Sequence, residues 1–297
     1  MGVVVIGQIG RDLVLRTDRP PTAGESATVL RREELLGGKG ANQAVGLAQL
    51  GVPVTLIGVV GDDQAGTSIL QQAQRDGIDV SKVARRGTTA LLVDVVAAPP
   101  ERMLLEDVPD SSLVRVADLD RSSSLFDTAD TVSIQLQQPA ATALEAAQRA
   151  RQRGLRVVAD GVPAPQVRAD LLATLDVLRA DATEASIIAG TEITTVEQAF
   201  ELADHLLSGG PELVALAVPD VGDLLTWRGG SELFEFADVE VVDPTGAGDA
   251  FVAGLVAALR EGAAPREAGR RAAAAAGATV QRLGGRPSRR WTIAAPP

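Results

Sequence analysis

The sequence predicts an α/β protein with a mostly parallel central sheet, helices on both faces and a small antiparallel lid sheet at one edge. Short continuous apolar runs alternate with segments of helical periodicity, and two pairs of strand-like segments interrupt that alternation. The length of 297 residues and the 45% hydrophobic composition are enough for a large core without disulfides. We expect a single domain over residues 1–297.

The N-terminal part predicts the first strand–helix–strand unit. Val3–Ile6 is a continuous apolar run ended by Gly7, typical of a strand buried on both faces. Ala41–Leu50 carries apolar residues at helical spacing and ends at Gly51, and a second strand is expected at Val54–Val59. A strand, a helix and a strand in this order predict a right-handed crossover and parallel pairing.

The same alternation continues toward the C-terminus. Helices are expected at Ala140–Arg153, Ala169–Leu175, Glu197–Leu207 and Ala250–Arg260, and strands at Leu155–Ala159, Val177–Leu178, Leu213–Val218 and the apolar end Val239–Val242. Helices between successive strands can cover both faces of one parallel sheet.

Two pairs of short strand-like segments break this rhythm. They are Leu13–Arg16 with Ala27–Leu35, and Thr89–Val96 with Arg102–Asp107. A proline-containing connection joins the second pair in the manner of a hairpin. We therefore expect a lid at one edge of the domain, formed by residues of about 11–36 and 88–108.

The composition excludes several kinds of site. The net charge is 28 − 39 = −11, without the basic footprint of a duplex-binding protein. The absence of Cys and the single His205 exclude thiol nucleophiles, disulfides and two-histidine metal sites. No apolar run reaches the roughly 20 residues that span a bilayer, and the N-terminus lacks a basic signal region. We expect a cytoplasmic protein without nucleic-acid or membrane partners.

The strongest local feature is the glycine-rich stretch Asp243–Phe251 before a predicted helix. The N–H groups of Gly246, Ala247 and Gly248 would lie unpaired at the helix N-terminus, where free donors and the helix dipole together bind anions. Asp249 follows in the first turn, either as a capping carboxylate or as a general base beside a bound phosphate.

A second glycine-rich stretch, Gly37–Ala44, leads into the helix after the first lid segment. It is either a glycine-rich turn capped by Asn42 or a backbone that a polyhydroxylated ligand approaches, with Lys39 and Asn42 as donors. Other motifs are incomplete: a P-loop needs glycine at Glu33, and the dinucleotide fingerprint needs glycine at Phe251.

The pair of stretches, about 200 residues apart, resembles the two signatures of the ribokinase (PfkB) family of sugar and nucleoside kinases. The resemblance covers essentially the whole chain. It implies transfer of the γ-phosphoryl group of ATP to a sugar hydroxyl. It also implies that Asp249 is the base, while the N–H groups of Gly246, Ala247 and Gly248 form the anion hole.

The resemblance also implies a sugar site formed by Asp12, Gly38, Lys39, Asn42 and Gln137. Gln137 stands where ribokinases carry a sugar-contacting glutamate, and Gly10 stands where they carry an asparagine. These two differences put ribose itself in doubt.

The cofactor residues are implied in the same way. Asp181 and Glu184 correspond to a family segment that organises Mg²⁺, with Glu184 acting through water and Asp181 replacing an asparagine. Gly222 is expected near the nucleotide, although Pro219 replaces a family glycine just before it. A loop for a monovalent cation would involve Asp243, Thr245, Gly285 and Ser288, which makes a K⁺ requirement a hypothesis.

The leading interpretation is an ATP-dependent kinase of a small sugar, which forms a homodimer through the lid. A nucleoside, deoxyribose or fructose-type kinase of the same family is the alternative within the class. A non-catalytic relative that binds sugar or nucleotide is the alternative outside it, and retention of Asp249 and Glu184 argues against it. A dinucleotide-dependent oxidoreductase lacks its glycine fingerprint.

Overall fold

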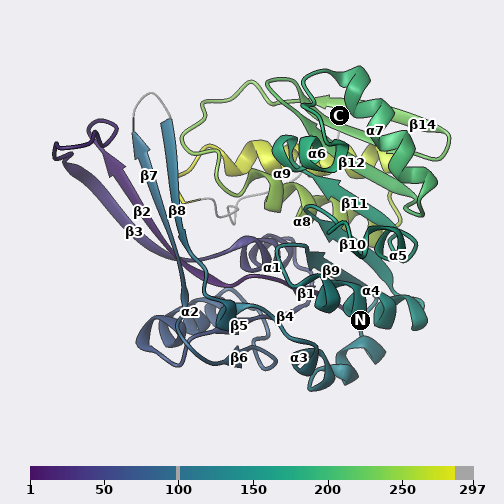
Figure 1. Cartoon of the computed structure of the whole chain (residues 1–297), viewed down its shortest axis with the longest axis horizontal. Coiled ribbons are helices and arrows are strands. Elements are labelled where there is room, and N and C mark those ends of the chain that lie inside the picture. The colour runs from purple at the N-terminus through teal and green to yellow at the C-terminus, as the bar shows by residue number, and fades with distance from the viewer. Residues whose placement is uncertain (98–100, 285–297) are drawn as a thin grey trace.

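A computed structural model describes residues 1–97 and 101–284 of the chain. Within this part, eight strands form the larger sheet in the order β14-β13-β12-β11-β10-β9-β1-β4 (Figure 1). The pairs from β4 to β12 are parallel, and β13 and β14 add an antiparallel edge. The strands are β1 (Val3–Ile6), β4 (Val54–Ile57), β9 (Thr131–Gln135), β10 (Arg156–Asp160), β11 (Val177–Ala180), β12 (Leu213–Val218), β13 (Gly222–Trp227) and β14 (Gly230–Glu235).

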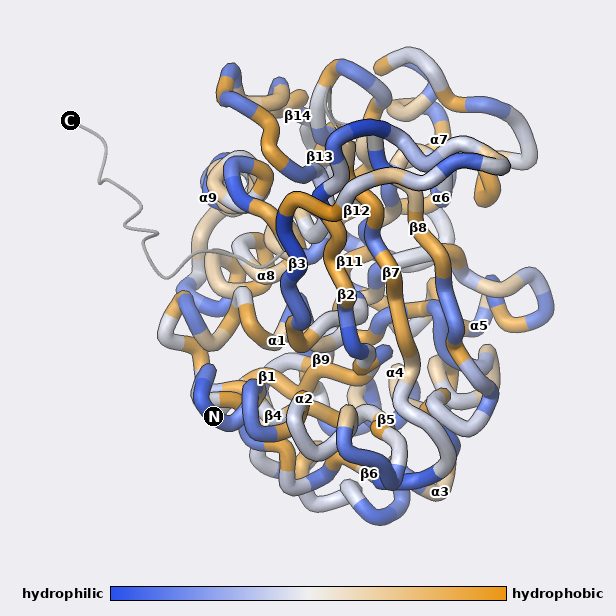
Figure 2. The backbone as a smooth tube through the Cα atoms, turned by 90° about the vertical axis from the view of Figure 1, so that its left-hand side faces the viewer, coloured by the Kyte–Doolittle hydropathy of each residue, from blue (hydrophilic) through white to orange (hydrophobic). Residues whose placement is uncertain are grey.

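A second, four-stranded sheet projects from one side of the larger sheet (Figure 1). Its order is β3-β2-β7-β8, and its strands are β2 (Gly10–Thr17), β3 (Val29–Gly37), β7 (Ala90–Ala97) and β8 (Glu101–Asp107). The pairs β2–β3 and β7–β8 are antiparallel, as expected, and a parallel β2–β7 pair joins them. Figure 2 shows β7 as largely hydrophobic, β2 as hydrophobic in its middle, and β3 as hydrophilic in its middle.

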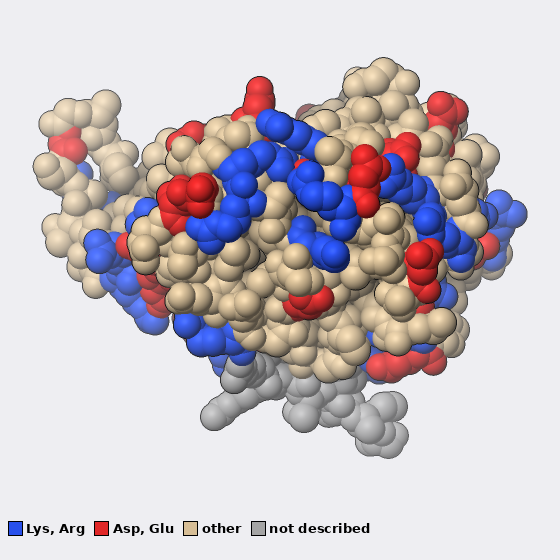
Figure 3. Space-filling view, turned by 90° about the horizontal axis from the view of Figure 1, so that it is seen from below, with Lys and Arg blue, Asp and Glu red and all other residues tan. Residues whose placement is uncertain are grey.

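Charges are unevenly distributed over the surface. Seen from below, basic side chains form a band that is crossed by acidic ones (Figure 3). Part of this charge is neutralised locally: Arg86 donates to the buried carboxylate of Asp118 at 2.8 Å, and Arg149 pairs with Asp120 at 2.7 Å. In the described part of the chain, no helix is both long and apolar enough to cross a membrane.

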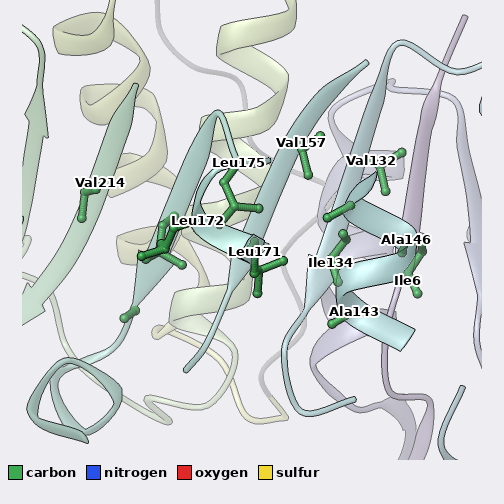
Figure 4. Close-up of a cluster of buried hydrophobic side chains, with 14 of the residues drawn as sticks. Ile6, Val132, Ile134, Ala143, Ala146, Val157, Leu171, Leu172, Leu175 and Val214 are labelled. Atoms are coloured by element: carbon green, nitrogen blue, oxygen red, sulfur yellow. The ribbon is translucent and has the colours of Figure 1, made fainter. Parts of the chain in front are cut away.

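The interior consists of two hydrophobic clusters, one on each face of the larger sheet. Val3 and Val5 of β1 belong to one cluster, and Val4 and Ile6 belong to the other. Figure 4 shows part of the second cluster, with Ile6 among its side chains. This alternation explains why a strand buried on both faces is continuously apolar. Helices α1 (Lys39–Gln49), α8 (Ala247–Arg260) and α9 (Pro265–Thr279) contribute to the first cluster, and α4 (Ala140–Gln152), α5 (Arg168–Leu172), α6 (Ala182–Ala189) and α7 (Val196–Ser208) to the second.

The remaining elements extend these layers. Helix α2 packs on β2 and β3, α3 packs on α4, and β5 pairs with β6. Their bounds are Gln64–Arg75 for α2, Val116–Asp120 for α3, Val59–Val60 for β5, Ala84–Arg85 for β6, and Asp110–Ser112 and Ser123–Asp127 for two 3₁₀ turns.

The strand end expected at Val239–Val242 is wrong. The N–H groups of Val242 and Asp243 both donate to the carbonyl of Val280, at 2.8 and 3.1 Å, and so join the end of α9 instead of a sheet. Helix α8 begins at Ala247, three residues before the expected start, so the glycine-rich turn contributes its first residues.

Candidate active site

A cavity of about 640 Å³ lies between the carboxyl ends of the parallel strands and the four-stranded sheet. Both glycine-rich stretches, the turn from β11 into α6, and strands β7 and β8 line it. Ligands of open α/β sheets bind outside the carboxyl ends of the strands, and this cavity is in that position.

The turn at residues 246–248 forms the wall at the N-terminus of α8. Gly246 caps the helix in the left-handed conformation, with φ of 73°, which glycine adopts without strain. The first N–H groups of a helix have no partner within it. That of Ala247 makes only a 3.4 Å contact with the Pro244 carbonyl. Since Gly246, Ala247 and Gly248 all line the cavity, their backbone can receive an anion there.

Asp249 is the third residue of α8 and lies inside the helix, not at its cap. Its side chain is 6% exposed; Asn42 Nδ2 donates to Oδ2 at 3.0 Å, and Gln43 Nε2 lies 3.4 Å from Oδ1. Burial raises the pKa of Asp249 to about 7, the charge of Asp160 adds to the rise, and Lys39 opposes it. A carboxylate with such a pKa is well matched to accept a proton at neutral pH.

The first glycine-rich stretch forms the opposite wall. A Cβ on Gly37 would lie 1.8 Å from Cγ of Asp12, so glycine leaves the space that this buried carboxylate fills. Gly38 caps α1 with φ of 86°, and Asn42 lies inside that helix, so Asn42 as a helix cap is wrong. The structure brings Asp12, Gly38, Asn42 and the exposed Gln137 to the same cavity.

Lys39 also lines the cavity, and it connects the two walls. Its Nζ donates to Glu184 Oε1 at 2.6 Å and lies 3.7 Å from Asp181 Oδ2. Burial opposes the charged form, but the carboxylates of Asp160 and Glu184 hold the pKa of Lys39 above its usual range. The lysine expected at the sugar therefore also pairs with the residues expected at Mg²⁺.

Comparison with known proteins identifies the family. The model of the pfkB family carbohydrate kinases matches residues 2–292. The chain belongs to the pfkB family of carbohydrate kinases. It is 30% identical to a ribokinase of Haemophilus influenzae over 297 residues, covering 98% of this chain and 97% of that one. It is also 30% identical to an ATP-dependent ribose-1-phosphate kinase of Halopiger xanaduensis, covering 86% and 83%.

Solved structures agree with this assignment. The structure of Arabidopsis thaliana ribokinase complexed with ribose and ATP superposes with a TM-score of 0.80 at 26% identity, covering 97% of this chain and 96% of that one. A ribokinase from Thermotoga maritima gives 0.81 at 27% identity, covering 96% and 94%. The chain is thus a ribokinase-like sugar kinase, and the expected fold and enzyme class are confirmed.

The residues expected at Mg²⁺ form a reciprocal cap at the start of α6 in this kinase. Asp181 Oδ1 accepts from the Glu184 N–H at 2.8 Å, and Glu184 Oε2 accepts from the Asp181 N–H at 2.9 Å. Both side chains line the cavity, and carboxylate oxygens suit Mg²⁺. Among the described residues, no three His, Cys, Asp or Glu side chains converge as direct metal ligands. Two carboxylates at the cavity wall are oxygen donors of the kind that a Mg²⁺ ion with several waters takes.

The remaining predicted site residues lie farther out. Gly222 begins β13 and does not line the cavity described here; its hydrogen leaves room for the Phe234 carbonyl oxygen, which would lie 2.1 Å from a Cβ on this residue. The buried Asp243 accepts from the N–H groups of Thr245 and Gly284, both at 2.9 Å. Gly285 and Ser288 lie outside the described residues.

Several polar residues that line the cavity or hydrogen-bond to its lining residues were not predicted. Asp160, at the end of β10, accepts from Gln43 Nε2 at 3.0 Å and from Arg179 Nη1 at 3.2 Å. In the four-stranded sheet, buried Asp94 accepts from Arg102 at 2.5 Å. A charged residue inside an otherwise apolar strand could have identified them from the sequence, as at Arg179 in β11 and Asp94 in β7.

Proposed function

We propose that this sugar kinase transfers the γ-phosphoryl group of ATP to a hydroxyl of a small neutral sugar. The observation that carries the proposal is the position of Asp249. A buried carboxylate with a pKa of about 7 directly follows a turn whose N–H groups line the same cavity. A proton acceptor and an anion site side by side are what phosphoryl transfer to an alcohol requires.

In the proposed step, Asp249 takes the proton of the acceptor hydroxyl. The oxygen forms a bond to the γ-phosphorus, and the bond from that phosphorus to the bridging oxygen breaks, which releases ADP. The N–H groups of Gly246, Ala247 and Gly248 stabilise charge on the transferred group. Asn42 holds the Asp249 carboxylate in place through its 3.0 Å hydrogen bond.

Asp181 and Glu184 would hold Mg²⁺ through its waters. When bound, the ion neutralises charge on the phosphate oxygens. Lys39 keeps both carboxylates oriented toward the cavity through its contacts at 3.7 and 2.6 Å.

The charges on the sugar side favour a neutral polyol. Asp12, Asp94 and Glu106 line this part of the cavity, and Arg102 is already paired with Asp94. Carboxylates accept hydrogen bonds from sugar hydroxyls but repel a second phosphate. A sugar phosphate, as in the name of the Halopiger relative, is therefore the less favoured acceptor, and nucleosides, deoxyribose and fructose remain alternatives within the family.

The test is ADP release from magnesium ATP across a panel of pentoses, hexoses, deoxysugars, sugar phosphates and nucleosides. Asp249→Asn is the control, because it keeps the shape of the side chain and removes the base. We expect one neutral sugar to stimulate ADP release and the variant to lose about 10²–10⁴-fold in kcat. A sugar-dependent signal of equal size in Asp249→Asn would contradict the proposed role.

We also propose that a monovalent cation binds beside Asp243. The Oγ1 of Thr245 is buried and has no hydrogen-bond partner among the residues that the structure describes, as a cation ligand would. Both oxygens of Asp243 accept from backbone N–H groups, which ties residues 243–245 to Gly284. Equal activity with K⁺ and with tetramethylammonium would contradict this.

We further propose that segments 11–36 and 88–108 act as a lid on a single domain and pair with a second copy. Asp12, Leu92 and Leu104 point into the cavity, so their strand neighbours face outward. On that outer face Met103 is 39% and Leu105 64% exposed. A dimer would bury this apolar surface, and light scattering at micromolar concentration that gives a monomer mass would contradict it.

A further inference from the structure

An arginine lies buried beneath the turn at residues 246–248. Arg179 belongs to β11, a strand buried along its whole length, and is 6% exposed. Its Nη1 donates to Asp160, which is fully buried. Burial opposes the charged form, but Asp160 and other carboxylates keep the pKa of Arg179 above its usual range. The guanidinium is therefore a permanent cation inside the molecule.

The guanidinium lies directly against Gly248. A Cβ at residue 248 would be 2.6 Å from both Nη atoms of Arg179 and 2.8 Å from Cζ. Arg179 also lines the same cavity as Gly246 and Asp249. Glycine at 248 thus does more than expose an N–H group, since it leaves space for this cation next to the anion site.

The hydrogen bonds of Arg179 are incomplete. A guanidinium has five N–H groups, and the structure gives an acceptor to Nη1, while the buried Nε has none among the described residues. Burying an unpaired donor costs about 1–3 kcal/mol. A ligand with several acceptor oxygens at the cavity wall would satisfy the remaining donors.

The charge around the cavity requires such a cation. Asp181, Glu184 and Asp249 line it, and the charge of the buried Asp160 reaches Asp249, so these carboxylates would repel a phosphate. The N-terminus of α8 offers only about half a positive charge. Lys39 Nζ contacts both Glu184, at 2.6 Å, and Asp181, at 3.7 Å. Arg179 is also paired, with Asp160 at 3.2 Å, but its guanidinium keeps a donor without an acceptor among the described residues.

We propose that Arg179 is the side-chain cation of the anion site and contacts the phosphoryl group during its transfer. The proposal rests on the function proposed above. The competing explanation is that Arg179 only neutralises the buried carboxylates of Asp160 and Asp223. The two explanations differ in what happens when Arg179 and its hydrogen-bond partner Asp160 are replaced together.

The experiment therefore compares Arg179→Met with the double variant Arg179→Met/Asp160→Asn. The single variant leaves a buried carboxylate unpaired and can fail to fold, whereas replacing both members of a buried ion pair is often neutral for stability. We expect the double variant to unfold near the wild-type temperature and to lose about 10²–10³-fold in kcat, as when an anion-hole donor is removed. A kcat within threefold of wild type would overturn the proposal.

A matched control exists at the other end of the same helix. Arg260 of α8 pairs with Asp130 at 2.6 Å, away from the cavity. The variant Arg260→Met/Asp130→Asn should keep wild-type kcat. An equal loss of kcat in both double variants would mean that any disturbance of α8 lowers activity, and it would overturn the specific role of Arg179.

Nucleotide binding separates this inference from the proposed function. Calorimetry with Mg²⁺ should show that the Arg179 double variant binds the non-hydrolysable ATP analogue AMP-PNP about tenfold more weakly, with ADP affected less than twofold. If the double variant binds AMP-PNP and ADP equally more weakly, or binds both as wild type does, the proposed contact with the transferred group is overturned. If wild type is inactive on every sugar, the proposed function fails, and this binding difference still tests Arg179.

Discussion

The two glycine-rich stretches begin helices in the same way but use their glycines differently. Gly38 and Gly246 both cap a helix with a left-handed φ, of 86° and 73°. In the first stretch, Gly37 leaves space for the Asp12 carboxylate, and Gly40 lies against the backbone of Gly7. In the second stretch, Gly248 lies against the Arg179 guanidinium and lines the cavity.

The difference shows that a glycine pattern can have two physical causes. The first stretch is compact because protein atoms fill the space around its glycines, and its role is to place Asp12, Lys39 and Asn42. The second is open because its residues, together with a buried cation, line the cavity. Substitution by alanine should therefore weaken sugar binding in the first stretch and slow phosphoryl transfer in the second.

Of the two alanine substitutions, Gly248→Ala is expected to have the larger effect on kcat. The new Cβ would meet Arg179 at 2.6 Å and push the guanidinium away from the anion site. The same displacement pulls the guanidinium from the buried Asp160 carboxylate, which costs more than the up to about 1 kcal/mol of helix propensity that alanine adds. We expect kcat to fall about 10²-fold and the unfolding temperature to fall as well. Unchanged kcat would mean that the glycine is not needed for the anion site.

A smaller effect on kcat, and a clear one on sugar binding, is expected from Gly37→Ala. The Cβ would lie 1.8 Å from the Asp12 carboxylate, which cannot keep its position. We expect KM for the sugar to rise about tenfold or more, the loss expected for a displaced pocket hydrogen bond. The unfolding temperature should fall as well. Steady-state kinetics of both alanine variants side by side test the comparison, and a loss of kcat with unchanged KM here would contradict it.

The sequence predicted the buried parallel strands well because burial on both faces leaves a continuous apolar run. Val3–Ile6 and Leu213–Val218 have the expected bounds. The β13–β14 edge was not predicted; the turn before it uses Asp220 at φ of 58°, a conformation that the sequence pattern assigns to glycine. The strand end predicted at Val239–Val242 was wrong because apolar residues there are not buried in a sheet: Val241 is 42% exposed in a loop.

The site was predictable only in part, because its contacts join residues that are far apart in the sequence. The two signatures indicated Asp249 and Asn42 separately, and only the fold shows the hydrogen bond between residues 207 positions apart. Arg179 and Asp160 belong to neither signature, and each lies at an apolar strand where charge is unexpected. Their pairing across β10 and β11 depends on strand order, which a single sequence does not state.

The pH dependence of Asp249 also distinguishes the second stretch from the first, with a moderate effect on activity and a small one on stability. Asp249 acts in its ionised form, so kcat/KM should fall about tenfold per pH unit below about 7, the pKa that burial beside Asp160 gives it in the free protein. The free energy of unfolding changes with pH in the opposite direction, falling as the pH rises. A raised pKa means that the folded state binds the proton more tightly than the unfolded chain, so the stability from protonated Asp249 is lost as pH rises from about 4 to 7.

Asp249→Asn removes that dependence. It should therefore unfold a few degrees above wild type at pH 8, and the gap should narrow toward pH 4. Calorimetric scans across this range measure it, and Asp12→Asn is the comparison from the other stretch. A gap for Asp249→Asn that is constant with pH would mean that the carboxylate titrates normally. The case for a base held near neutrality by burial would then fail, even with the anion turn intact.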